Sequence, residues 1–336
     1  CSHNGDKLYH AIAEFAYQWK DHHVAEAGFV DYIESEAVSF PESMIDKITP
    51  RPDEDVRRGL ELDGVEDIAP ILTAKNTYAA PFVNAEETQY LVIEDRFVNG
   101  REALRAQGLY FADRQTVDQV EKMKVCTCLN PLHTALAVFG CLLGYDKISE
   151  EMKDPELKHM VELIGYKEGL PVVTDPGILD PMEFLRTVLE VRLPNPFMPD
   201  TPQRIATDTS QKLAIRFGET VKAYDKTPGL DASDLRMIPL VLAGWIRYLM
   251  AIDDEGKTFE LSADPMLSEL CPLVQNIVWG DPDTAKKIRP ILEDARIFGV
   301  DLEEAGLMEK VCAYFAELIE GPGAVRATLK KYGKEQ

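Results

Sequence analysis

Lysine, asparagine and histidine side chains that could act on an alcohol or a ketone occur together in the segment KVCTCLNPLH. Asn130 suits the residue before a helix and Pro131 its first position, which puts His133 near the same helix entrance. A desolvated Lys124 could serve as general base towards an alcohol. The Asn130 amide could donate to a developing oxyanion, and His133 could orient the lysine or the substrate. By spacing alone, ordinary helix capping beside a solvated lysine remains the simpler interpretation.

A second group of charged residues recurs every four positions: Arg204, Asp208 and Lys212. This spacing places them on one face of a helix. Two interpretations are open. A basic pair could hold polyol hydroxyls or a carboxylate, or the three residues could form a solvated ladder of salt bridges.

Acidic residues lie among apolar ones in two further segments. Asp46 and Lys47 follow a predicted strand, where they form either part of a site or a turn with a surface ion pair. Glu94 and Asp95 are adjacent acids that could bind a metal in principle. No histidine lies near them and no H-x-x-x-H spacing occurs, so the sequence predicts no metal site.

The elements that would position these residues are mostly helical, because apolar residues recur with helical periodicity. Strand patterns are limited to Ala37–Phe40 and Tyr90–Ile93. There is no G-x-G-x-x-G or G-x-x-x-x-G-K-[ST] segment and no alternation of strands with helices. The sequence therefore predicts a mainly α fold with a few short strands and no nucleotide-binding sheet. The predicted helices are Asp6–Lys20, Gln115–Cys128, Leu132–Leu143, Glu156–Gly165, Pro181–Val191, Pro202–Phe217, Ala232–Ile252, Pro282–Ile297, Leu302–Ile319 and Ala324–Tyr332.

Composition excludes several classes of partner. The 336 residues are 45% apolar, enough for a sizeable core, and carry a net charge of -22. A chain this acidic repels phosphate backbones and anionic lipid. We therefore expect neither nucleic-acid binding nor membrane binding. The most apolar stretch, Leu235–Ile252, is interrupted by two arginines and falls short of the roughly 20 apolar residues that span a bilayer. An anionic substrate would need a local basic site.

The six cysteines show no C-x-x-C spacing. Most lie in apolar, helix-like segments, which is typical of reduced core thiols in a cytoplasmic protein. Cys126 and Cys128, with Cys141 further on, leave a metal cluster as the alternative.

An ordered set of motifs resembles one family. In chain order they are HNG, FP-x-S-M-I-D-K-I-T-P, VIED-x-F-VNG, K-x-x-x-x-x-N-x-x-H, D-x-S-Q-K and LAGWIRY, from residue 3 to about residue 250. Together they resemble the mannitol dehydrogenase family of polyol-specific long-chain dehydrogenases. Each motif is weak alone, and the ordered set is specific.

The resemblance implies a fold and an activity. Family members join a dinucleotide-binding domain to a helical C-terminal domain like that of 6-phosphogluconate dehydrogenase. On that basis residues 1–336 are predicted to be the helical substrate domain, with the Rossmann domain lying before Cys1 and absent from the chain. The implied reaction moves a hydride between NAD or NADP and C2 of a keto-sugar acid or polyol without a metal. Fructuronate–mannonate is the leading substrate pair and fructose–mannitol the alternative. A non-catalytic helical interaction domain is the alternative from another class.

The resemblance also implies roles for individual residues. Lys124 would be the base, Asn130 would complete an oxyanion site, and His133 would lie beside them. The substrate contacts would come from Asp46, the Arg204–Lys212 pair and Asn4 of the HNG motif. The residues that determine the preference for NAD or NADP would lie on the Rossmann domain. The family usually separates its lysine and asparagine by five positions, whereas 124 to 130 is six, so we expect a π-bulge in this helix.

Overall fold

The chain folds into two compact units, each described separately below. The computed structural model describes residues 3–26, 28–49, 54–74, 78–79, 81–87, 90–104 and 106–334. Unit 1 consists of Cys1–Ile48, Ala85–Met123 and Thr174–Asp180. Unit 2 consists of Thr49–Asn84, Lys124–Val173 and Pro181–Gln336.

Unit 1 contains a three-stranded sheet in the order β1-β4-β5. Strand β1 (Ser43–Asp46) runs antiparallel to β4 (Tyr90–Glu94), and β4 runs parallel to β5 (Leu109–Ala112). Helix α4 (Arg114–Met123) packs against β1 and β4. Buried and partly buried residues alternate along β4, as expected for a strand with one face on a core. The strand predicted at Tyr90–Ile93 is thus confirmed.

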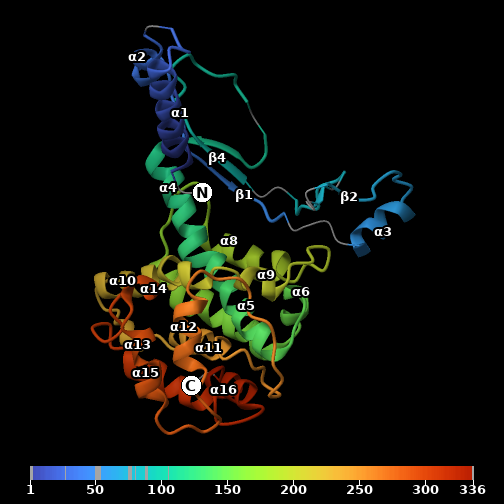
Figure 1. The fold of residues 1–336 in the computed structure, drawn as a ribbon, viewed down its shortest axis with the longest axis vertical. Helices are drawn as coiled ribbons and strands as arrows, with labels where there is room; N and C mark the ends of the chain where they lie inside the picture. Colours follow the sequence, from blue (N-terminus) through green and yellow to red (C-terminus); the bar gives the residue numbers. More distant parts are fainter. Residues whose placement is uncertain are drawn as a thin grey trace. The chain divides into compact units, whose positions relative to one another are not determined.

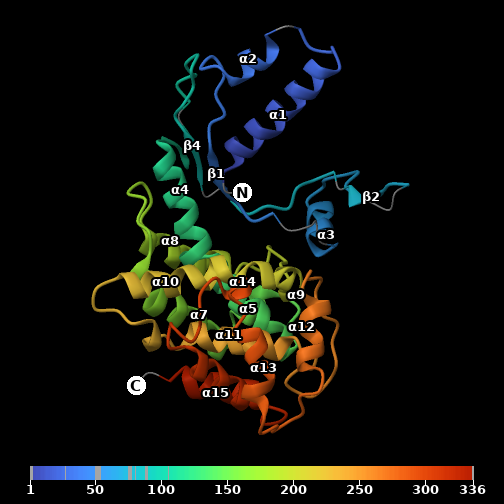
Figure 2. The ribbon, with the colours of Figure 1, turned by 60° about the vertical axis from the view of Figure 1, so that its left-hand side comes forward.

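Two helices of unit 1 lie side by side, as Figures 1 and 2 show: α1 (Asn4–Asp21) and α2 (Phe29–Glu34). Apolar side chains join them in a small core made of Ile12, Ala16, Phe29, Val30, Ile33 and Phe40. The strand predicted at Ala37–Phe40 was wrong, because this segment is irregular. Phe40 packs into the small core, and the sheet pairing begins only at β1.

Unit 2 is built around helices that are apolar on every side. Helix α11 (Met237–Tyr248) packs against both α5 (Asn130–Leu143) and α15 (Met308–Leu318). All residues of α11 are buried, which is the pattern of a helix inside a core rather than on a surface. Gly244 allows α11 to approach α5 closely, since a Cβ there would lie 2.8 Å from the ring of Phe139 in α5.

Several other elements of unit 2 are π-helical. The π-helical segments are η1 (Lys124–Cys128), η2 (Leu163–Gly169), η4 (Val188–Arg192) and η6 (Ala214–Gly218). The short 3₁₀ segments are η3 (Leu170–Val172), η5 (Thr209–Gln211) and η7 (Ala232–Asp234). The α-helices are α3 (Glu54–Leu62), α6 (Ile148–Glu151), α7 (Pro155–Glu162), α8 (Pro181–Thr187), α9 (Pro202–Ala206), α10 (Glu219–Lys226), α12 (Leu267–Val274), α13 (Thr284–Leu292), α14 (Ala295–Phe298) and α16 (Ala324–Tyr332). Strands β2 (Ile71–Leu72) and β3 (Tyr78–Ala79) pair antiparallel.

One helical stretch, Arg114–Leu143, is long and apolar enough to cross a membrane by length and composition. It is longer than Leu235–Ile252, the stretch that the sequence indicates as the most apolar. However, 83% of its most apolar window is buried inside the protein. Such burial is typical of a core helix.

The predicted helix Pro202–Phe217 was wrong. Helix α9 ends at Ala206, and Asp208 adopts a left-handed conformation with φ 54°. The backbone N–H of Asp208 donates to the carbonyl of Ala263, 2.8 Å away, instead of to a helical partner. A contact distant in sequence therefore breaks a segment whose periodicity is helical.

Candidate functional site

Lys124 opens a π-turn in unit 2. The amide of Leu129 donates to the carbonyl of Lys124, 3.1 Å away, which is an i→i+5 bond. The wider turn accommodates the sixth residue between Lys124 and Asn130, so the expected π-bulge is confirmed. The Thr220 hydroxyl donates to the carbonyl of Cys126 at 3.1 Å and satisfies an acceptor within the turn.

Asn130 lies one position further into the helix than the sequence predicted. Leu129 is the capping residue, and Asn130 and Pro131 open α5. No side chain caps this helix start. Within the residues that the structure describes, the Asn130 side chain makes no hydrogen bond, although its carbonyl accepts one from the Thr134 hydroxyl at 2.9 Å. The Asn130 amide is therefore available to donate to a ligand.

His133 lies one turn further along α5 and faces an acidic residue. Its Nε2 is 3.5 Å from Oδ2 of Asp200, and both side chains are nearly buried. The pKa of His133 is lowered to about 4, mainly by burial; Asp200 opposes the shift, and the charges of Arg216, Arg204 and Arg192 add to it. The imidazole is therefore neutral near pH 7 and can donate through one nitrogen and accept through the other.

Asp200 joins His133 to Arg204. The Nε of Arg204 donates to Oδ1 of Asp200 at 2.5 Å, and its Nη2 also contacts Oδ2, which makes a two-pronged ion pair. Asp200 is fixed in turn by its neighbour, since the amide of Thr201 donates to Oδ1 at 3.0 Å. The interpretation as a salt-bridge ladder was wrong, because Arg204 pairs with the residue four positions before it and not with Asp208.

Lys212 lies beside the same loop. Its Nζ donates to the carbonyls of Ile205 and Thr207. Burial lowers its pKa, the charges of Arg216 and Arg204 add to the shift, and Asp208 and Asp264 oppose it. Lys212 is thus a partly buried cation with both basic and acidic neighbours.

The sequence analysis did not single out Asp200, Arg216 or Glu151. Arg216 donates from Nη1 to the Thr134 hydroxyl, which links it to the start of α5. The i+4 spacing from Lys212 to Arg216 was the available signal. Glu151 is fully buried, and burial raises its pKa well above its ordinary value, with the charges of Asp154 and Asp200 adding to the shift. Nothing in the Ser-Glu-Glu segment around Glu151 distinguishes it from a surface acid.

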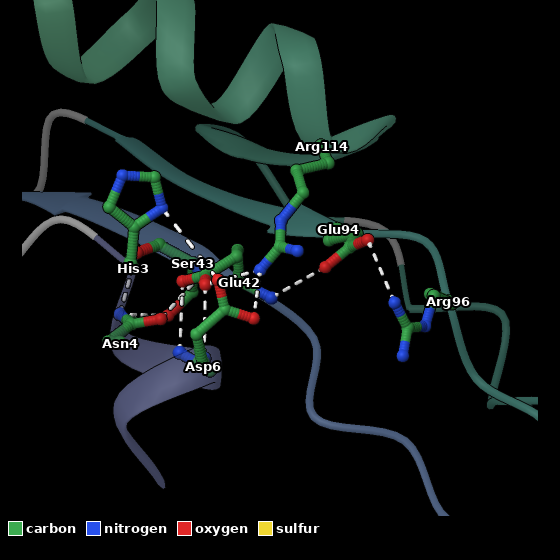
Figure 3. A network of polar contacts seen from close by, with 9 residues as sticks. His3, Asn4, Asp6, Glu42, Ser43, Glu94, Arg96 and Arg114 are labelled. Atoms are coloured by element: carbon green, nitrogen blue, oxygen red, sulfur yellow. Dashed lines mark hydrogen bonds and ion pairs between the residues drawn. The ribbon is translucent and has the colours of Figure 1, made fainter. Parts of the chain in front are cut away.

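The remaining predicted residues, Asn4 and Asp46, belong to unit 1. The Asn4 amide pairs with Ser43: its Nδ2 donates to the Ser43 carbonyl at 2.7 Å, and its Oδ1 accepts from the Ser43 amide at 3.0 Å (Figure 3). Asn4 thereby ties the start of α1 to β1. Asp46 is fully buried at the end of β1.

In unit 1, the HNG motif lies beside a pair of acidic residues, Asp6 and Glu42. Glu42 accepts from the amides of Gly5 and Asp6 at 2.9 and 3.1 Å, and Arg114 pairs with both acids (Figure 3). Gly5 is required at this close approach because a Cβ would lie 2.4 Å from the carbonyl oxygen of Phe40. His3, Asp6 and Glu42 also bring three possible metal ligands within 4.8 Å of one another. Their hydrogen bonds and ion pairs already explain the two acids.

Comparison with known proteins places this arrangement in context. The family model of the mannitol dehydrogenase C-terminal domain matches residues 116–319. D-mannonate oxidoreductase of Thermotoga maritima is 54% identical over 333 residues, which are 98% of this chain and 61% of that protein. The structure of Pseudomonas fluorescens mannitol 2-dehydrogenase in ternary complex with NAD and D-mannitol aligns with a TM-score of 0.71 and 26% identity. A substrate-free D-sorbitol dehydrogenase aligns with a TM-score of 0.75 and 25% identity. Both alignments cover 98% of this chain and 60% of the solved one.

The predicted fold class, a helical C-terminal domain with the Rossmann domain absent, was wrong. The match to the family model of the C-terminal domain begins at residue 116. The matches to whole dehydrogenases, by contrast, extend over 98% of the chain. Much of the region before residue 116 forms unit 1, whose sheet includes a parallel pair of strands. The short strand β5 is partly buried throughout and lacks the alternation that would have revealed it.

Proposed function

This chain belongs to the mannitol dehydrogenase family, and we propose that it carries the substrate-activating residues of an oxidoreductase that interconverts fructuronate and mannonate. The observation that carries the proposal is the start of α5, where an unbonded Asn130 amide and a neutral, buried His133 follow the π-turn of Lys124. The 54% identity to a D-mannonate oxidoreductase supports this substrate pair.

In the proposed reaction, a bound nicotinamide cofactor, NAD or NADP, supplies or accepts the hydride at C2. The residues of this chain act on the oxygen atom. In the reducing direction the Asn130 amide donates to the carbonyl oxygen as negative charge develops there. The Lys124 ammonium gives its proton to the same oxygen, so the product is an alcohol and Lys124 is left as an amine. In the oxidising direction that amine takes the proton back.

His133 has a positioning part in this proposal. A neutral imidazole held by Asp200 can donate to or accept from a substrate hydroxyl without changing charge. Lys212, Asn4 and Asp46 remain proposed substrate contacts. The cofactor-binding residues are not assigned, because the chain has no G-x-G-x-x-G segment.

The substrate is tested by assaying the intact protein with fructuronate and with fructose, each with NADH and NADPH. We expect a clear preference for fructuronate. A preference for fructose would favour the second candidate, mannitol 2-dehydrogenase activity, which the alignment with that enzyme supports.

The role of Lys124 is tested by Lys124→Ala. The variant should lose roughly 10²–10⁴-fold in kcat, the usual contribution of a general base, and should retain the fold by circular dichroism. Lys122→Ala is the matched control, because Lys122 is exposed two residues earlier. Equal rates in the two variants would remove Lys124 from the mechanism.

We also propose a reducing location such as the cytoplasm. Among the residues that the structure describes, the buried thiols of Cys128, Cys141 and Cys312 form no disulfide. Burial raises the pKa of both Cys128 and Cys141 to about 12, which makes these thiols unreactive. Thiol titration of protein purified without reductant tests this proposal, and disulfide-linked cysteines would contradict it.

A further inference from the structure

Arg216 occupies an unusual position close to the proposed site. It lies in the π-turn η6, and η6 packs against η1, the π-turn that begins with Lys124. Its Nη1 donates to the hydroxyl of Thr134, and that hydroxyl donates to the carbonyl of Asn130. A chain of two hydrogen bonds therefore holds Arg216 against the first turn of α5. Single π-turns occur often at functional sites, and here two of them meet.

The charge of Arg216 is not neutralised within the protein. Among the residues that the structure describes, no carboxylate lies within 4.0 Å of its guanidinium. Burial lowers the pKa of Arg216 to about 10, so it is still cationic near pH 7. Arg204 differs, because Asp200 already binds it through two contacts. Within the described residues, Arg216 thus differs from Arg204 in having no carboxylate partner.

The Arg216 guanidinium is partly buried and is held at one corner of its fork. Its Nη1 donates to the Thr134 hydroxyl, and its other N–H groups make no hydrogen bond within the part of the chain that the structure describes. A planar fork with free donors matches the two oxygens of a carboxylate.

The surroundings of Arg216 favour an anionic ligand. Lys212 precedes it by one turn, and the positive charges of Arg204, Arg192 and Arg216 all act on His133. Acids are present as well, since Asp200 is shared by His133 and Arg204, and Asp208 and Asp264 act on Lys212. In a chain with a net charge of -22, a cluster of four basic side chains is nonetheless a specific feature.

We propose that Arg216 binds the carboxylate of a sugar-acid substrate and so distinguishes it from the corresponding neutral polyol. The inference rests on the proposed function, because it assigns a specificity residue to the same site. It also reassigns carboxylate recognition from Arg204, whose role becomes the positioning of Asp200 and His133.

The test compares an acid with its neutral counterpart. Binding of mannonate and of mannitol to the intact protein, with the reduced cofactor present so that neither is oxidised, is measured by calorimetry for wild type, Arg216→Gln and Arg204→Gln. In Arg216→Gln we expect mannonate affinity to fall about 100-fold and mannitol affinity to change less than about threefold, since a charged partner is removed from the acid alone. Arg204→Gln should weaken both ligands by a similar factor, because it releases Asp200 from its position beside His133.

The outcomes separate this inference from the proposed function. Equal weakening of both ligands in Arg216→Gln, or no weakening of mannonate, overturns the assignment of Arg216. Because binding is measured without turnover, a wild type that binds mannonate through Arg216 but does not oxidise it would refute the proposed reaction and leave the inference standing. Arg216→Lys keeps the charge but not the fork, and should recover part of the mannonate affinity. Thermal unfolding of each variant shows whether a loss of binding reflects a loss of folding.

Discussion

Replacing Glu151 with glutamine should make the stability of unit 2 less dependent on pH. Glu151 is fully buried, and neither carboxyl oxygen has a hydrogen-bond partner within the described residues. The carboxyl group lies against α5, since a Cβ at Gly140 would be 2.1 Å from its Oε1. Burial raises its pKa well above the ordinary value. The folded chain therefore keeps a proton on Glu151 at pH values where the unfolded chain has lost it.

The sign and size of the effect follow from this raised pKa. The contribution of Glu151 to stability is fully present below the pKa of an unfolded glutamate, about 4.3, and is lost as pH rises towards the folded pKa. Within that window unfolding releases one proton, which lowers the free energy of unfolding by about 1.4 kcal/mol for each pH unit. Two pH units in the window correspond to about 2.7 kcal/mol. Glutamine carries no charge in either state and removes this dependence.

The assay is urea unfolding between about pH 5 and about pH 8, followed by tryptophan fluorescence. A Trp19→Phe background removes the tryptophan of unit 1 and leaves Trp245 and Trp279, both in unit 2. Glu150→Gln is the matched control, because Glu150 is exposed and pairs with Lys153 on the surface.

The comparison that decides the matter is the difference between wild type and Glu151→Gln as pH rises. This difference should grow steadily in favour of the variant, while Glu150→Gln should follow wild type. Parallel pH dependences for wild type and Glu151→Gln would refute the reasoning, since they would show that Glu151 releases no proton on unfolding in this range.

Three further predictions concern the elements that hold the site. Gly5→Ala should destabilise unit 1 by about 1–3 kcal/mol, because its Cβ would clash with the Phe40 carbonyl; faster hydrogen exchange in α1 is the measurement. Thr220→Val should lower the free energy of unfolding by about 1 kcal/mol and Thr220→Ser should not, since only the valine loses the bond to Cys126; urea midpoints decide this. The His133 imidazole should stay neutral from about pH 8 to about pH 5 in NMR titration, because its pKa is lowered to about 4. Its contribution to stability is then lost as pH falls from about 6.5 to about 4, and an imidazole midpoint near 6.5 would contradict this.

Features that depend on local sequence could be predicted. The π-turn at Lys124 was visible as one extra residue before Asn130, because a count of positions is a property of the sequence itself. The core helices α5 and α11 were also visible, because continuous apolar segments of that length have few other conformations in a folded chain.

Features that depend on distant contacts could not be predicted. The partner of Arg204 was misjudged because the helix break at Asp208 depends on the carbonyl of Ala263, more than fifty positions away in the chain. Glu151 is an ordinary acid in sequence, and only tertiary packing makes it a buried one. The two strands that pair with β4, namely β1 and β5, were missed because they are short and β5 shows no alternation.

The π-turn at Lys124 also has a consequence for how sequences in this family correspond to one another. One residue inserted into a regular α-helix turns everything after it by about 100° and advances it by about 1.5 Å. Helix α5 is buried from Pro131 to Leu142 and could not be turned in that way without losing its packing. Because the wide turn takes up the insertion within Lys124–Cys128, the phase of α5 is preserved. Relatives with one residue fewer there can therefore share the helical phase of this chain beyond Asn130, and chimaeras joined after that residue should keep their core side chains facing inward.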